Sequence, residues 1–169
     1  RVGDEWWIWF DANMGDLESV GDRSIGLATS SDGVTWVKYD DPATTEAPYD
    51  LSDPVLVTDA GEWDERRVYD PGVERLGDGF VMTYFTRRPG TSAPEYDAGI
   101  AFSDDGITWQ KDARNPFFRS GSFGFAGVYL STLIQTDEGF VLLFDVQSSP
   151  GSGTTVWYRL HEGMLEPLP

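Results

Sequence analysis

Short apolar runs separated by glycine, aspartate and asparagine recur along the chain and predict many short β-strands. The clearest example is residues 26–36, GLATSSDGVTW, which return as residues 99–109, GIAFSDDGITW. Seven of the eleven positions are identical, at an offset of 73 residues. Each copy predicts a strand of small residues, a tight Asp-Gly turn of the two-residue hairpin kind, and a strand led by β-branched residues and tryptophan.

A second set of segments repeats around these copies. Residues 79–85, GFVMTYF, match residues 139–145, GFVLLFD, at an offset of 60, and residues 5–11, EWWIWFD, have the same character. A further strand precedes two of them, at residues 68–76 and again at residues 128–134. The repeated unit is therefore four strands in meander order, with short glycine-containing turns inside each unit.

A four-stranded sheet of this size cannot bury both faces alone, so the copies must pack against each other. Radial packing of such sheets gives a β-propeller, whereas a β-sandwich, the main alternative, does not predict a recurring four-strand unit. The sequence thus predicts an all-β partial propeller of about three four-stranded antiparallel blades. Blade one, with strands two to four, is expected over about residues 4–57, blade two over about 67–118 and blade three over about 126–161.

The expected arc is open. Blade one begins at its second strand and no fourth strand follows in blade three, which gives about ten strands in all. Because an open arc leaves strand edges and sheet faces exposed, we expect it to close with another chain, most simply as a homodimer forming one ring. The alternative is that these residues are a piece of a longer polypeptide.

Composition narrows the functional classes. The chain has 169 residues, which fits one domain, and seven Trp, seven Tyr and ten Phe favour an all-β fold. Twelve Lys plus Arg stand against 29 Asp plus Glu, a net charge of −17. Such a surface repels a phosphate backbone, so no nucleic-acid partner is expected. No apolar run approaches the length that spans a membrane, so no membrane partner is expected either.

The sequence contains few residues of the types that bind metals or cofactors. The chain has no cysteine and one histidine, His161, which excludes disulfides, thiolate metal sites and histidine-rich sites. No cofactor and no dedicated metal site are therefore expected, although a Ca²⁺ held by carboxylates is compatible with the acidity. The cellular location stays open, with secretion among the options.

Several of these motifs together resemble a known superfamily. They are RVYDPGV at residues 67–73, FVMTY at residues 80–84, and the Ala-x-Ser strand with its Asp-Gly-x-x-Trp turn at residues 99–109. This combination resembles the five-bladed β-propeller glycosidases, which include glycoside hydrolase families 43, 32, 62 and 130. The resemblance covers nearly the whole chain but only part of a family propeller. It implies a glycosidase-like protein that acts on or binds a polysaccharide or oligosaccharide.

The repeat separates the two Asp-Pro pairs. Asp53-Pro54 aligns with Asn115-Pro116, after the tryptophan, and is expected at the periphery of a blade. Asp70-Pro71 opens an inner strand, where the resembled families carry an active-site carboxylate. Asp70 is therefore the first candidate catalytic residue, and the structural alternative is that Asp-Pro only opens a turn.

The long loops are expected at the same end of the blades as Asp70, where function usually concentrates. Asp11 and Asp145, each closing a second strand, are the other candidate catalytic residues. Trp63 is expected either to stack on a sugar ring or to plug a loop. The candidate substrate-binding residues at this end are Arg66, Arg67, Trp63, Tyr69, Arg87 and Arg88.

The catalytic set is incomplete in this chain. The resemblance to family 43 implies three acidic residues on successive blades, yet the position of Asp70 in the next blade is Leu130, followed by Ser131. Two hypotheses remain open. One is a hydrolase of O-glycosidic bonds whose pocket is completed by a second chain or by further sequence. The other is a non-catalytic glycan-binding or structural half-propeller that assembles as a homodimer.

Overall fold

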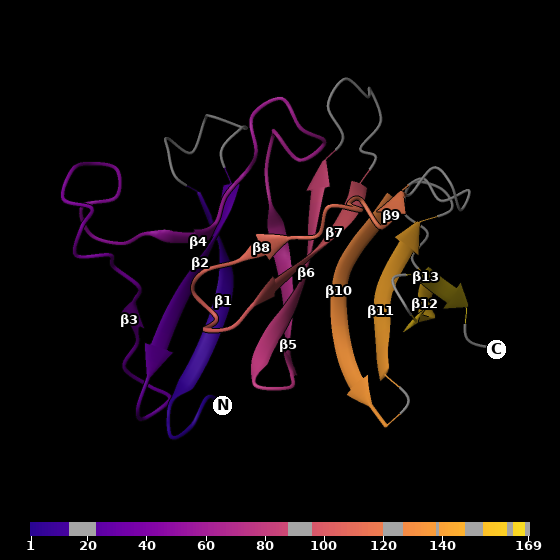
Figure 1. The fold of residues 1–169 in the computed structure, drawn as a ribbon, viewed down its shortest axis with the longest axis horizontal. Helices are drawn as coiled ribbons and strands as arrows, with labels where there is room; N and C mark the ends of the chain where they lie inside the picture. The colour runs from indigo at the N-terminus through magenta and orange to yellow at the C-terminus, as the bar shows by residue number, and fades with distance from the viewer. Residues whose placement is uncertain are drawn as a thin grey trace.

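The protein folds into three antiparallel sheets that follow one another along the chain and stand side by side (Figure 1). The computed structural model describes residues 1–13, 23–87, 96–119, 127–137, 139–147, 154–161 and 164–167. Every regular element in these ranges is a β-strand, so none of them is a helix that could cross a membrane. The predicted all-β partial propeller is confirmed, and we refer to the sheets as blades one, two and three.

Blade one has β2 at its centre. β1 pairs with one edge of β2, and the short strands β3 and β4 pair in succession with the other edge. The strands of blade one are β1 (Trp6–Asn13), β2 (Arg23–Ser30), β3 (Val37–Lys38) and β4 (Pro54–Leu56).

Blade two repeats this arrangement and adds an inner strand. The order is β5-β6-β7-β8, and β9 also pairs with β7. The strands are β5 (Tyr69–Leu76), β6 (Gly79–Arg87), β7 (Tyr96–Ser103), β8 (Gln110–Lys111) and β9 (Phe118–Arg119).

Blade three is a four-stranded meander in the order β10-β11-β12-β13. Its last strand was not expected from the sequence, because residues 164–167 lack the turn motif of the other blades. The strands are β10 (Gly127–Thr136), β11 (Gly139–Gln147), β12 (Thr154–His161) and β13 (Met164–Pro167).

The Asp-Gly turns differ from the expectation. Thr29 pairs with Val37, so the loop of blade one runs from residue 30 to residue 36 and is not a two-residue hairpin. The Asp32 carboxylate accepts hydrogen bonds from the backbone N–H groups of Val34 and Thr35, at 2.8 and 2.7 Å. These bonds replace the strand pairing that the pattern of β-branched residues suggested.

The outer strand of blades one and two is split into two short pieces. β4 pairs with Ile25 and β9 pairs with Ala98, positions that are one repeat of 73 residues apart. The peripheral place expected for Asp53-Pro54 and Asn115-Pro116 is therefore confirmed. Two-residue turns do occur elsewhere, for example where Leu76 pairs with Gly79.

A tight turn precedes β1 in blade one. Val2 and Glu5 form an antiparallel bridge, and Gly3 has a φ of 60°, the same value as Gly77 in the turn between β5 and β6. Residues 1–6 therefore repeat the turn formed by residues 75–80. The first strand of blade one is β1, which is equivalent in register to β6, and the assignment of blade one to strands two to four stays a prediction.

The apolar core lies between the blades. Ile25, Leu56 and Val68 form a cluster with Met82 and Tyr84 where blade one meets blade two. Leu133 and Leu142 of blade three join a second cluster on the opposite face of blade two. Successive residues of β6 thus face opposite neighbours, as strand geometry requires, and both of its faces are buried.

Candidate functional site

Asp70 lies at the second position of β5, directly after the loop over residues 57–67 that leads from blade one into blade two; Figure 1 shows β5 between β1 and β6. It is the one non-glycine residue with a positive φ, 50°, in the part of the chain that the structure describes. The pairing of β5 with β6 shifts register between Tyr69 and Gly72, so a β-bulge contains Asp70. Bulges and left-handed non-glycine residues are enriched at functional sites, where the surrounding structure holds them.

Asp11, at the end of β1, holds this strained residue from the neighbouring blade. Its Oδ1 accepts a hydrogen bond from the backbone N–H of Asp70 at 3.1 Å. Its Oδ2 lies 3.3 Å from Nη1 of Arg23, the first residue of β2. Both carboxylate oxygens of Asp11 are thus engaged, and its catalytic role stays a prediction.

The backbone joins the two blades at the same place. The N–H of Val68 donates to the carbonyl of Arg23 at 3.1 Å, and Arg23 and Arg67 form a parallel bridge. The side chains of Arg23 and Asp11 are 43% and 29% exposed, so this ion pair lies at the surface. A site built here is therefore open to solvent and contains the Asp11–Arg23 ion pair beside the backbone of Asp70.

Tyr69 turns away from this surface. Its ring is buried in the cluster between blades two and three and meets the ring of Tyr96 edge-on at 5.9 Å. Burial, followed by the charges of Tyr96 and Asp70, raises the pKa of the Tyr69 hydroxyl far above its usual value. The role of Tyr69 in substrate binding stays a prediction, and its ring contributes first to the core.

The remaining predicted residues are Trp63, Arg66, Arg87, Arg88 and Asp145. Trp63 is half-buried and packs on Tyr84, with ring centroids 5.8 Å apart. This packing is what the alternative of a loop-filling role for Trp63 would require. Arg66 is exposed and Arg87 is half-buried at the end of β6. Arg88 lies outside the described residues, and the side chain of Asp145 is likewise not described. Their roles stay predictions.

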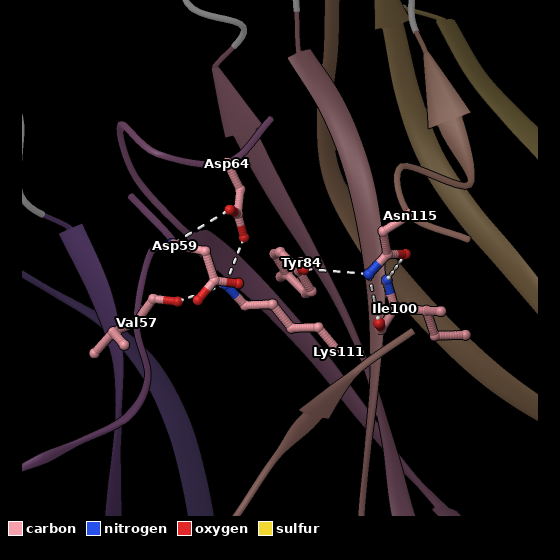
Figure 2. Close-up of polar contacts among 7 residues, drawn as sticks. All are labelled: Val57, Asp59, Asp64, Tyr84, Ile100, Lys111 and Asn115. Carbon is pink, nitrogen blue, oxygen red and sulfur yellow. Dashed lines mark hydrogen bonds and ion pairs between the residues drawn. The ribbon is translucent and has the colours of Figure 1, made fainter. Parts of the chain in front are cut away.

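An ion cluster around the buried Asp64 fixes the loop that leads to Asp70 (Figure 2). Nζ of Lys111, on β8, lies 2.6 Å from Asp64 and 2.9 Å from Asp59, and it donates to the carbonyl of Val57 at 2.7 Å. Asp64 is fully buried and Lys111 is 16% exposed. The loop over residues 57–67 is therefore tied to blade two before the chain enters β5.

Tyr84 and Asn115 extend this polar region inward (Figure 2). The amide of Asn115 pairs with both backbone groups of Ile100 at 2.9 Å and donates to the Tyr84 hydroxyl at 3.3 Å. Burial, and then the charges of Asp64 and Asp59, raise the pKa of that hydroxyl. Sequence reasoning missed this cluster. One signal for it was present in the sequence: a lysine recurs at the same repeat position, as Lys38 and as Lys111.

Metal-ligating residues do not gather in threes among the described side chains.

Comparison with known proteins gives a likeness in structure only. No protein-family model matches the chain, and no curated protein matches it significantly. The Bombyx mori GH32 β-fructofuranosidase BmSUC1 superposes over 100% of this chain with a TM-score of 0.72 and 16% identity. The chain has the fold of a partial glycosidase propeller.

Two further structures agree. A thermostable family-43 glycoside hydrolase gives a TM-score of 0.62 at 14% identity over 95% of this chain. Zg3597, a family 117 glycoside hydrolase of the marine bacterium Zobellia galactanivorans, gives 0.67 at 15% identity over 97%. This chain spans only 33%, 53% and 42% of the three matched proteins, in the order given. The resemblance to propeller glycosidases is thereby confirmed for the fold, over part of a propeller.

Proposed function

We propose that this protein is a glycoside hydrolase-like propeller that acts on a polysaccharide or oligosaccharide at the end of the blades that carries Asp70. The strained, bulged position of Asp70 is the observation that supports this proposal most strongly. Asp70 is half-buried, and the Asp11 carboxylate that accepts from its backbone N–H also pairs with Arg23. The glycosidase neighbours in structure are consistent with the same class of substrate.

Asp70 and Asp11 have different roles in this proposal. Asp70 is the carboxylate that meets the sugar, either as an acid/base group or by tuning the pKa of one. Asp11 is a positioning residue that keeps the Asp70 backbone in its left-handed conformation, and Arg23 orients Asp11. The further carboxylates that glycoside hydrolysis needs would come from Asp145 or from outside this chain.

The test is release of sugar from a panel of aryl glycosides and plant or marine oligosaccharides. Asp70→Asn keeps the shape and tolerates the left-handed conformation but removes the charge, so we expect turnover to fall by about 100-fold or more. Asp11→Asn keeps an oxygen that accepts from the Asp70 N–H, so its loss should be only about tenfold in kcat. Arg75→Gln, at the opposite end of β5, is the matched control and should leave turnover unchanged.

The alternative is a non-catalytic glycan-binding protein. Its supporting observation is the absence of an acidic residue at the Asp70 position of blade three, where Leu130 stands. Calorimetric binding of the same oligosaccharides without turnover would favour this alternative. Turnover that survives Asp70→Asn would contradict the catalytic role of Asp70.

We also propose that the arc is completed by a second copy of the chain. The chain spans 33% and 53% of two of the glycosidases on which it superposes, and this partial coverage supports the proposal.

A further inference from the structure

Indole rings fill the seam between blades one and two. Trp7 and Trp9 of β1 face blade two, where their ring centroids lie 6.2 and 5.6 Å from that of Phe80. Trp109 of blade two meets Trp9 edge-on at 6.3 Å. The indole N–H groups of Trp9 and Trp109 both donate to the carbonyl of Gly106, at 3.0 and 3.1 Å. Aromatic side chains of the chain itself therefore close this seam.

The seam between blades two and three lacks the first two of these rings. β1 and β6 share one register, because the strand partners of Trp7 and Val81 lie one repeat of 73 residues apart. The same register places Thr83 at the position of Trp9. Two indoles of one seam are thus replaced by two much smaller side chains in the other.

Blade three also lacks a counterpart of the third ring. In blade two, residues 104–109 connect β7 to β8 and end on Trp109. In blade three, β12 ends at His161, which pairs with Met164 at the start of β13. Only residues 162 and 163 connect these two strands, and neither is a tryptophan. The second seam is therefore built without the aromatic filling of the first.

A hollow of about 390 Å³ lies at the corresponding place between blades two and three. Its apolar wall contains Val81, Ile100 and Phe102 of blade two and Phe140 of blade three. Phe117, just before β9, completes this wall. Three phenylalanine rings thus line a space whose volume falls in the range of about 300–1,000 Å³ that is typical of small-molecule pockets.

One edge of the hollow is polar. Arg114 donates two hydrogen bonds to the carboxylate of Asp112, from Nε at 3.0 Å and from Nη2 at 2.7 Å. Hydrogen bonds from the side chain and backbone of Arg114 lower the pKa of Asp112 to about 2, so the two opposite charges compensate each other at neutral pH. Arg114 is 69% exposed, and its Nη1 makes no hydrogen bond to the described residues. Nη1 can therefore donate to an oxygen atom in the hollow.

Asn115 lies at the same edge, but its amide is already engaged. Its Oδ1 accepts from the N–H of Ile100, and its Nδ2 donates to the carbonyl of Ile100 and to the Tyr84 hydroxyl. The hollow thus presents three aromatic rings, one guanidinium edge and no uncompensated charge among the residues that line it. This combination favours a flat, uncharged ring that carries an oxygen atom at its edge.

We propose that this hollow, which we call the seam pocket, binds an uncharged phenolic ring. The ring of the ligand takes the place that Trp7 and Trp9 fill in the first seam, and its hydroxyl oxygen accepts from Nη1 of Arg114. Offset or edge-on contacts with the three phenylalanine rings add to the burial of apolar surface against Val81 and Ile100.

The seam pocket is separate from the candidate site at Asp70. Its wall includes Leu76, the last residue of β5, whereas Asp70 is the second residue of that strand. Six residue steps along a strand span about 20 Å. The pocket also lies between two consecutive blades, so a further blade added at either end of the arc would not cover it. The proposal therefore rests neither on sugar turnover nor on how the arc is completed.

Calorimetric titration of the purified chain with 2-naphthol tests the proposal, because this compound is a flat, neutral phenol. We expect saturable binding with one site per chain. Decahydro-2-naphthol has the same carbon skeleton and hydroxyl group but no aromatic ring, so we expect it to bind at least about tenfold more weakly.

Variants of the wall locate the site. Phe117→Ala removes one ring and should weaken the binding of 2-naphthol by about tenfold. Val81→Trp restores the ring that blade one carries at the equivalent position, and it should abolish binding by filling the pocket. Arg114→Met removes one hydrogen bond and should weaken binding by about threefold to tenfold. Val55→Ala, at the repeat position of Phe117 in the first seam, is the matched control and should leave binding unchanged.

Circular dichroism and thermal unfolding of each variant establish that a loss of binding is not a loss of folding. If Val81→Trp does not fold, Phe117→Ala decides the matter. A wild type without saturable binding up to the solubility limit of 2-naphthol overturns the inference. So does wild-type affinity in Phe117→Ala, because the ligand then binds elsewhere, and so does equal affinity for decahydro-2-naphthol. None of these results bears on sugar turnover, which is measured separately.

Discussion

Blades one and two are built from the same repeat. Blade two buries the apolar side chains of β6 against blade one, whereas Trp6 and Ile8 at the equivalent positions of β1 are half-exposed. The turns of the two blades are nearly identical. The Ser30 and Ser103 hydroxyls donate to Asp32 and Asp105 at 3.0 Å in both copies, and Gly33 and Gly106 have φ values of 73° and 78°. Local sequence therefore decides the turn in each blade, whereas burial of the sheet faces depends on the neighbouring blade.

The same repeat position can therefore contribute differently to the free energy of unfolding in each blade. Tyr84 and Phe10, or Lys111 and Lys38, are equivalent in register but differ in what surrounds them. Substitutions at paired positions should therefore have unequal effects in the blade faces and equal effects in the turns.

The largest difference is expected between the apolar rows of β1 and β6. Met82→Ala removes a fully buried side chain between blades one and two and should lower the free energy of unfolding by about 2–5 kcal/mol. Ile8→Ala, at a position 45% exposed, should cost less than about 1 kcal/mol in dilute protein. Urea unfolding of both variants measures this. If both variants lose the same free energy of unfolding at low protein concentration, the two rows are equally buried and the contrast between the blades is wrong.

A smaller difference is expected for the two lysines. Lys111→Met leaves Asp64 buried without its cation and should cost about 3 kcal/mol, because an uncompensated buried charge is strongly unfavourable. Lys38→Met removes an exposed side chain and should cost about 0.5 kcal/mol or less. Thermal unfolding compares the two, with Lys111→Arg as a variant that keeps the charge.

If Lys111→Met and Lys38→Met unfold at the same temperature, the buried cluster does not stabilise the loop before Asp70. If Lys111→Met also lowers sugar turnover without raising KM, the cluster transmits its effect through the position of Asp70.

The smallest effect is expected for pH and should be shared by both blades. Backbone N–H groups of Thr35 and Val34 lower the pKa of Asp32 to about 2. For Asp105, burial raises the pKa, but the hydrogen bonds from Thr108 and Ile107 outweigh it and the net shift is downward. Both carboxylates therefore stabilise the fold above their unfolded pKa of about 3.9. The stabilisation from Asp32 is lost as the pH falls toward its folded pKa of about 2, and that from Asp105 is lost as the pH falls below the unfolded value.

Urea unfolding between about pH 5 and pH 2 should show this loss. Asp32→Asn and Asp105→Asn should each flatten the profile in this range, since neither side chain then titrates. A profile that keeps its wild-type slope in both variants would contradict a stabilising role for the turn carboxylates.

Much of the fold could be predicted from the sequence because it rests on local chemistry. The offset of 73 residues identified β2 and β7, and the Asp-Gly pairs identified turns that glycine permits at positive φ. The loop length and β13 were not predicted. Side-chain hydrogen bonds to Asp32 compete with strand pairing, and a strand as short as residues 164–167 carries no periodic signal.

The order of amino acids alone was enough to establish the blade repeat, the acidic charge and the place of Asp70 at the start of an inner strand. The packed structure was needed to show that Asp70 takes a left-handed conformation, that Asp11 of another blade holds its N–H, and that Asp64 meets Lys111. These contacts join residues 47 and 59 positions apart in the chain. Such pairings depend on how the sheets pack, and packing is set by the whole arc and not by any one segment.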